Sequence, residues 1–276
     1  MTQFDDMEET SMEQQNKAIE IPQYSLGKIL LIWAAAAAPM GVLGWLVGPG
    51  LARSQADVPM ARLGGITVGL IWQFVLVLIL LRREGSNLRW ADVRQRLWLV
   101  APSDAAGRTD RRLWWWLIPL ILVEAVFALM LSGMVEGLWV KLLPFFAEPP
   151  SFSMAGFMGS PESRAALVGN WGLFLLFLVQ MFFNTVIGEE LLFRGLLLPR
   201  MAAAFGKRDW LANGILFGLY HWHQPWGMLG SIIDGALLYA FPTKRFRSAW
   251  FGIAVHSGQS VYFAFLLLGL VLGLAK

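Results

Sequence analysis

The side chains best suited to chemistry lie in residues 184–200, where two adjacent carboxylates, Glu189 and Glu190, close a long apolar run. Arg194 follows Glu190 by four residues, so the two lie one helical turn apart and suit an ion pair that lowers the cost of burying both. Glu189 points about 100° away around the helix and has no local partner. We therefore expect Glu189 to take part in proton transfer, because ionisable groups at membrane depth usually mark functional sites.

Two later apolar segments carry histidines that can join these carboxylates. Phe217 and His221 lie four residues apart in one segment, and His256 and Ser260 lie four apart in the other, with Gln259 adjacent. At 1.5 Å per helical residue, Glu189, His221 and His256 lie ~16, ~18 and ~13 Å from the basic ends of their helices. A shared level predicts one common polar site. The alternative is that each group only hydrogen-bonds between helices.

Three further polar groups in apolar segments are expected to have other roles. His223 fits a hydrogen bond between helices near the outer boundary of the membrane. Glu124 has no obvious local partner, so it is expected to face the cavity or a basic group from elsewhere. Asp234 is expected either to orient a histidine or to hydrogen-bond to backbone.

Composition indicates a membrane protein. Of the 276 residues, 57% are apolar and only 15% are charged, and the apolar residues form runs longer than a water-soluble core needs. The absence of cysteine excludes disulfides, thiolate zinc sites and a cysteine nucleophile. The net charge of +3 arises from arginines between apolar runs, which is a signal of membrane topology and not of nucleic-acid binding.

These runs predict an all-α, polytopic membrane bundle of about seven transmembrane helices with a four-helix catalytic core. A spanning helix needs ~20 apolar residues. The fifth and sixth predicted spans are shorter than the others, and the segment 136–169 is expected to be an interfacial or re-entrant connection. Residues 88–100 suit an interfacial helix, with a solvated linker as the alternative. The seven predicted ranges are 26–47, 63–81, 113–134, 170–201, 209–223, 227–241 and 248–275.

Three regions are predicted. Residues 1–25 form a disordered acidic tail, 26–168 form the first membrane helices with interfacial segments, and 169–276 form the catalytic membrane core. The arginine-rich segment 82–112 and the later basic clusters fall on one side if the helices alternate, which predicts a cytoplasmic amino terminus and a carboxyl terminus on the opposite side. The plasma membrane is the expected location, and no cleaved signal peptide is expected.

The motifs together resemble the CAAX prenyl protease and bacteriocin-processing family of intramembrane endopeptidases, called CPBP or Abi proteins. That family carries Glu-Glu-x-x-x-Arg, then Phe-x-x-x-His, then His-x-x-x-Asn on successive membrane helices. Here Glu189, Glu190 and Arg194 match the first motif. Phe217 and His221 match the second. In the third motif His256 is present, and Ser260 stands in place of asparagine.

The resemblance implies peptide-bond hydrolysis. By analogy with the family, Glu189 is the general base, His221 helps to hold the water, and His256 with Ser260 donates to the oxyanion. Glu190, Arg194 and Phe217 would be structural support. The serine hydroxyl is about two heavy atoms shorter than an asparagine amide, so Gln259 is a substitute donor if Ser260 does not reach.

A zinc site made of Glu189, His221 and His256 is the alternative mechanism, because two histidines and one carboxylate form a known catalytic zinc set. A metal-free site is favoured because the sequence has no His-Glu-x-x-His helix, and no cofactor is expected. A chelator test would decide between them.

The predicted partners are the lipid bilayer and a peptide or membrane-tethered protein substrate, with no nucleic acid. The substrate is expected to enter from the cytoplasmic side or through a gap between helices. Two rival functions remain: a catalytically weak scaffold or bacteriocin-immunity protein, and a proton-coupled transporter, which also uses intramembrane carboxylates and histidines. No inverted repeat supports transport.

Overall fold

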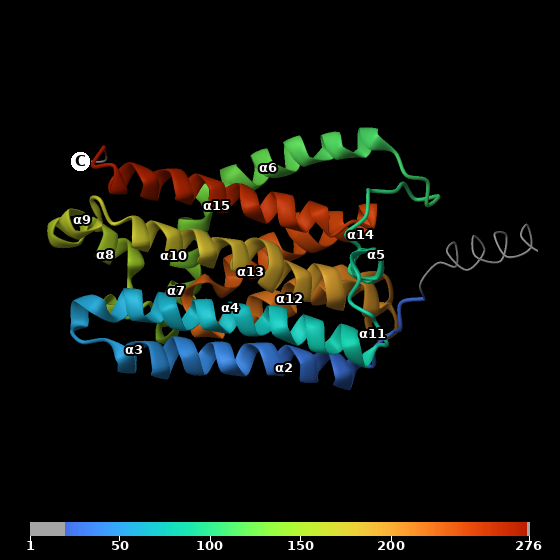
Figure 1. Cartoon of the computed structure of the whole chain (residues 1–276), viewed down its shortest axis with the longest axis horizontal. Helices are drawn as coiled ribbons and strands as arrows, with labels where there is room; N and C mark the ends of the chain where they lie inside the picture. The colour runs from blue at the N-terminus through green and yellow to red at the C-terminus, as the bar shows by residue number, and fades with distance from the viewer. Residues whose placement is uncertain (1–19, 275–276) are drawn as a thin grey trace, which may run out of the picture.

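The structure is a computed structural model that describes residues 20–274, so most of the predicted acidic tail lies outside the described residues. Within residues 20–274 the chain is a bundle of roughly parallel and antiparallel helices without a β-strand (Figure 1). This confirms the predicted all-α polytopic membrane fold.

Five continuous helical stretches are long and apolar enough to cross a membrane. Large apolar side chains such as Leu31, Leu46, Leu122 and Leu175 are 61% to 70% exposed, as a lipid-facing surface requires. The five stretches are Leu26–Leu51, Gln55–Arg83, Arg111–Leu142, Trp171–Arg200 and Trp250–Val271.

Several of these stretches combine α-helix with π-helical or 3₁₀ turns. The first contains α2 (Leu26–Val42), a π segment (Leu43–Val47) and α3 (Gly48–Leu51), the second ends in α4 (Val58–Arg83), and the last is α15 (Trp250–Val271). The third contains a 3₁₀ turn (Arg111–Trp116), α6 (Leu117–Val126), a π segment (Phe127–Leu131) and α7 (Ser132–Leu142). The fourth contains α10 (Trp171–Phe182), π segments (Phe183–Gly188 and Leu191–Leu197) and a 3₁₀ turn (Leu198–Arg200).

Two shorter helical segments correspond to the fifth and sixth predicted spans. One is α12 (Asp209–Tyr220) with the 3₁₀ turn His221–His223, and the other is α13 (Met228–Asp234), the π segment Gly235–Ala240 and α14 (Phe241–Phe246). They pack against each other along their lengths. The count of seven spans stays a prediction, because these two are shorter than the other five. The remaining short helices are α5 (Trp90–Arg96), α8 (Met154–Gly159), α9 (Pro161–Leu167) and α11 (Ala202–Phe205).

The prediction that residues 136–169 form one interfacial connection was wrong at its start. The third span continues as helix to Leu142, so Glu136 lies inside α7. The sequence hides this because Gly133 and Gly137 interrupt the apolar pattern, although a glycine in a helix costs only about 1 kcal/mol. The connection begins at Leu143 and contains α8 and α9.

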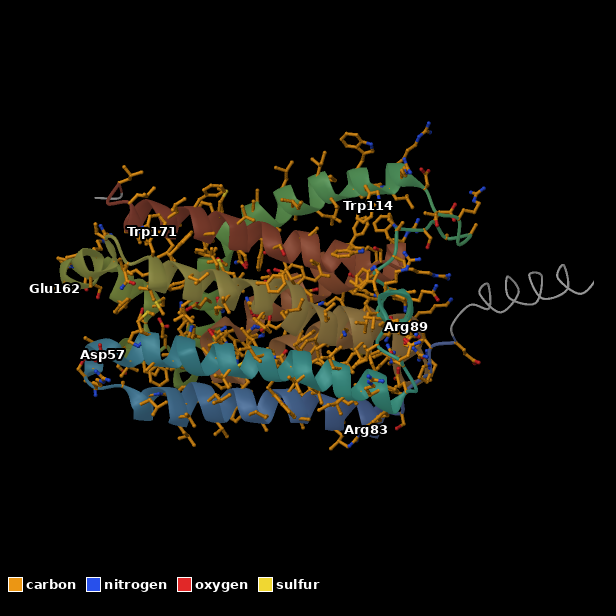
Figure 2. All side chains as sticks on the ribbon, viewed as in Figure 1. Asp57, Arg83, Arg89, Trp114, Glu162 and Trp171 are labelled. Atoms are coloured by element: carbon orange, nitrogen blue, oxygen red, sulfur yellow. The ribbon has the colours of Figure 1, made fainter. Side chains whose placement is uncertain are left out.

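The two ends of the bundle differ in charge (Figure 2). The end that carries Arg83 and Arg89, called the basic end below, also holds the loops with Lys207, Arg208, Lys244, Arg245 and Arg247. The end that carries Asp57 and Glu162 is called the opposite end. Helix α2 begins at the basic end and α15 finishes at the opposite end (Figure 1).

A buried ion pair ties the helices together at the basic end. Arg200 Nη2 lies 2.6 Å from Glu84 Oε2, and both side chains are at most 6% exposed. The Tyr24 hydroxyl donates to the same carboxylate, and Arg200 Nη1 donates to the Arg96 carbonyl at 3.1 Å. Segments far apart in sequence therefore meet here.

Candidate active site

The two glutamates lie on the only two residues of α-helix between the π segments Phe183–Gly188 and Leu191–Leu197. π-helical turns are rare and occur frequently at functional sites. Glu189 and Glu190 are 2% and 0% exposed, so both carboxylates are removed from solvent.

Glu190 is paired with two donors. Its Oε1 atom lies 3.0 Å from Arg194 Nη1 and 3.1 Å from His256 Nδ1. Arg194 is fully buried, donates through Nη2 to the Gly235 carbonyl at 3.0 Å, and lies over the Phe217 ring at 4.0 Å from its centroid. The Arg194 guanidinium is therefore held by an ion pair, a backbone hydrogen bond and an aromatic ring that come from different helical segments.

Glu189 faces a different set of neighbours. Its Oε1 atom lies 3.9 Å from His221 Nε2, which is longer than a hydrogen bond and leaves room for a bridging atom. With its amide nitrogen turned toward Glu189, Asn184 donates to both carboxylate oxygens at 3.1 Å. The Tyr220 hydroxyl is a further hydrogen-bond partner, and it accepts from Gln73 at 2.6 Å.

The hydrogen bond at His221 Nδ1 determines which ring nitrogen carries the proton. Nδ1 lies 2.8 Å from the Phe217 carbonyl oxygen, which can only accept, so Nδ1 is the donor. In the neutral ring, Nε2 is then an unprotonated acceptor that faces Glu189. The spacing of four residues between Phe217 and His221 thus has a direct structural consequence.

His256 is held by its ring face as well as by Glu190. Its ring stacks on Tyr239 with centroids 4.7 Å apart and an interplanar angle of 16°. The Tyr239 hydroxyl donates to Glu124 Oε1 at 2.9 Å. Glu124 is therefore paired with a tyrosine, and not with a basic group as one expectation held.

A cavity of about 360 Å³ brings the predicted residues together. Glu189, His221 and His256 all line it, although they come from three helical stretches. Asp234 and His223 line it too. His223 was predicted only to hydrogen-bond between helices, yet its ring lies 5.5 Å from that of His221 and its side chain is 2% exposed. Its position two residues after His221 was the signal that could have drawn attention to it.

Comparison with known proteins adds to this geometry. Residues 170–262 match the family described as type II CAAX prenyl endopeptidase Rce1-like. This segment is similar to the CAAX protease family. The match confirms the resemblance found in the motifs, and the chain is an integral, multi-pass membrane protein. No curated protein and no solved structure matches the chain.

The third CAAX protease motif departs from the family pattern in the structure as well. Gln259 lines the cavity beside His256, whereas Ser260 is not among the cavity-lining residues. A glutamine amide can donate a hydrogen bond as the usual asparagine does. The role of Ser260 as an oxyanion donor stays a prediction, and Gln259 is better placed for it.

The residues do not converge as a metal site. Among residues 20–274, no group of three His, Cys, Asp or Glu side chains lies close enough to hold an ion. His256 Nδ1 contacts Glu190 and not Glu189, which separates it from the other two ligands of the proposed zinc set.

Proposed function

We propose that this chain hydrolyses peptide bonds within the membrane by glutamate and histidine catalysis. The CAAX protease match supports endopeptidase activity in general on membrane-associated substrates. The observation that carries the mechanism is the separation of roles within the cavity: Glu189 faces His221, and Glu190 is paired with Arg194 and His256.

In the first step, a water held between Glu189 and His221 Nε2 loses a proton to the Glu189 carboxylate. The resulting hydroxide attacks the scissile carbonyl carbon and forms a tetrahedral oxyanion. Glu189 then gives its proton to the leaving nitrogen as the C–N bond breaks, which yields a carboxylic acid and an amine. General acid–base catalysis of this kind contributes about 10²- to 10⁴-fold in rate.

His256 stabilises the oxyanion in this mechanism through Nε2, because Nδ1 is directed at Glu190. A carboxylate only accepts, so Nδ1 carries a proton, and Nε2 can donate only if the ring is an imidazolium. A donor to the oxyanion is worth about 3 kcal/mol.

The test is cleavage by the purified chain in liposomes, compared with Glu189→Ala and His221→Ala. We expect both variants to lose cleavage, and proteomic comparison of membranes containing active protein and Glu189→Ala to identify the substrate. Full activity of Glu189→Ala would refute the mechanism. Loss of activity with a chelator, restored by zinc, would favour the metal alternative, and proton-dependent uptake without cleavage would favour a transporter.

A further inference from the structure

The cavity extends from Glu189 toward the opposite end of the bundle. Beyond Glu189 and His221 its walls include Arg62 near the start of α4, Phe152, and Met154 at the start of α8. The length of the cavity can be measured along helix α4. Gln73 contacts the Tyr220 hydroxyl beside Glu189, and it lies eleven residues, or about 16 Å, from Arg62 along the helix.

Among the residues that the structure describes, the lining of this cavity does not continue to the basic end. None of the cavity-lining residues lies in residues 190–216, although this segment runs directly from Glu190 to the fifth helix. Leu192, Leu196 and Leu197 there are 0% exposed, and beyond them the Arg200–Glu84 ion pair closes the bundle. Buried side chains therefore separate the glutamates from the basic end.

The outer part of the cavity is built from fixed groups. Arg62 Nε donates to the Gly44 carbonyl at 2.9 Å, and Arg62 Nη2 donates to the His223 carbonyl at 2.8 Å. The Phe152 ring lies 4.1 Å from the guanidinium carbon. These contacts join four separate segments around the outer part of the cavity. This part of the cavity wall is therefore formed without a bound substrate.

The charge distribution assigns a side of the membrane to each end. The connections at the basic end carry the arginines of residues 82–112 and the basic loops at 206–208 and 244–247, whereas those at the opposite end carry Arg53, Lys141 and Arg164 together with Asp57, Glu148 and Glu162. Lysine and arginine are enriched in cytoplasmic loops. The basic end is accordingly cytoplasmic and the cavity faces the other side.

We propose that the substrate enters from the non-cytoplasmic side, so that this chain cleaves extended polypeptide segments presented at the outer face of the membrane. This rests on the proposed function for the cleavage step and replaces the expectation of entry from the cytoplasmic side. An extended segment of about five residues spans the ~16 Å between the levels of Arg62 and Gln73 on α4.

The chain contains no cysteine, so single-cysteine variants report one position each. Glu148→Cys and Ser231→Cys place a thiol at the outer part and on the wall of the cavity, and Arg245→Cys places one at the basic end. Each variant is treated with a membrane-impermeant maleimide in right-side-out and in inverted vesicles. Thermal unfolding of each purified variant checks that it folds.

We expect Glu148→Cys and Ser231→Cys to react in right-side-out vesicles, and Arg245→Cys to react only in inverted vesicles. The reverse pattern overturns the proposal even if the protein cleaves peptides. An unreactive Ser231→Cys beside a reactive Glu148→Cys also overturns it, because the cavity would then be closed to that side. Labelling as expected without cleavage of any added peptide would leave the access route standing and refute the proposed function instead.

Discussion

Glu189 and Glu190 are adjacent in sequence, but the same Glu→Gln substitution should affect them differently. Glu190→Gln removes the charge that compensates Arg194, whose side chain is 0% exposed. An uncompensated buried charge costs about 3–5 kcal/mol. For a chain of this size that corresponds to a fall in melting temperature on the order of 10 °C.

Glu189→Gln is expected to change stability much less than Glu190→Gln, because its ion-pair neighbour is His221, at 3.9 Å, and the glutamine amide oxygen can still accept from Asn184 or Tyr220. It should lower kcat by about 10²- to 10⁴-fold, the usual contribution of a general base. Each variant is the matched control for the other. Melting temperature followed by tryptophan fluorescence, and peptide cleavage in the same detergent, provide the two measurements. The reasoning is refuted if Glu189→Gln destabilises the protein as much as Glu190→Gln, or if it retains cleavage.

Substitutions at three further positions test individual side chains. Tyr239→Leu removes the stacking on His256 and should lower kcat roughly 2- to 10-fold with KM unchanged, whereas Tyr239→Phe keeps the stacking and should retain activity; equal kcat values for the two would contradict this. Ser260→Asn restores the family motif and should keep or raise cleavage, so complete loss of activity would show that the serine is required. Burial alone would raise the pKa of Glu84, but hydrogen bonds from Arg200 and Tyr24 outweigh it and lower the pKa below 4.5. The ionised Glu84 carboxylate therefore stabilises the folded state above pH 4.5, and this contribution is lost as the pH falls through the lower pKa that Glu84 has in the folded protein. Glu84→Gln should make the melting temperature fall less steeply at acid pH. An unchanged fall would contradict the assignment.

The contacts that sequence could predict are those set by helical spacing. Four residues separate Glu190 from Arg194, and the two form the expected ion pair at 3.0 Å. The same spacing between Phe217 and His221 places a carbonyl beside a ring nitrogen. Estimates of depth also placed Glu189, His221 and His256 at one level, and the structure brings all three to one cavity.

The contacts that sequence could not predict join residues far apart in the chain. Depth along a helix does not say which way a side chain points, so nothing in the spacing showed that His256 contacts Glu190 and not Glu189. Tyr239 and Glu124 are 115 residues apart, and no motif links them. The direction of the cavity depends in the same way on how distant helices pack.

Gly252 offers a direct test of that packing. It lies on α15 one turn before His256, and a Cβ added there would collide with Glu190 Oε2 and come within 3.1 Å of both Arg194 Cγ and Thr243 Oγ1. Gly252→Ala should therefore destabilise the protein by about 1–3 kcal/mol, as overpacking does, and lower cleavage by displacing the carboxylate that holds His256. Gly269→Ala is the matched control on the same helix, since a Cβ there meets nothing within 4 Å. That substitution should be neutral or stabilise by up to about 1 kcal/mol. Equal melting temperatures for the two variants would show that α15 does not approach Glu190 as closely as the site requires.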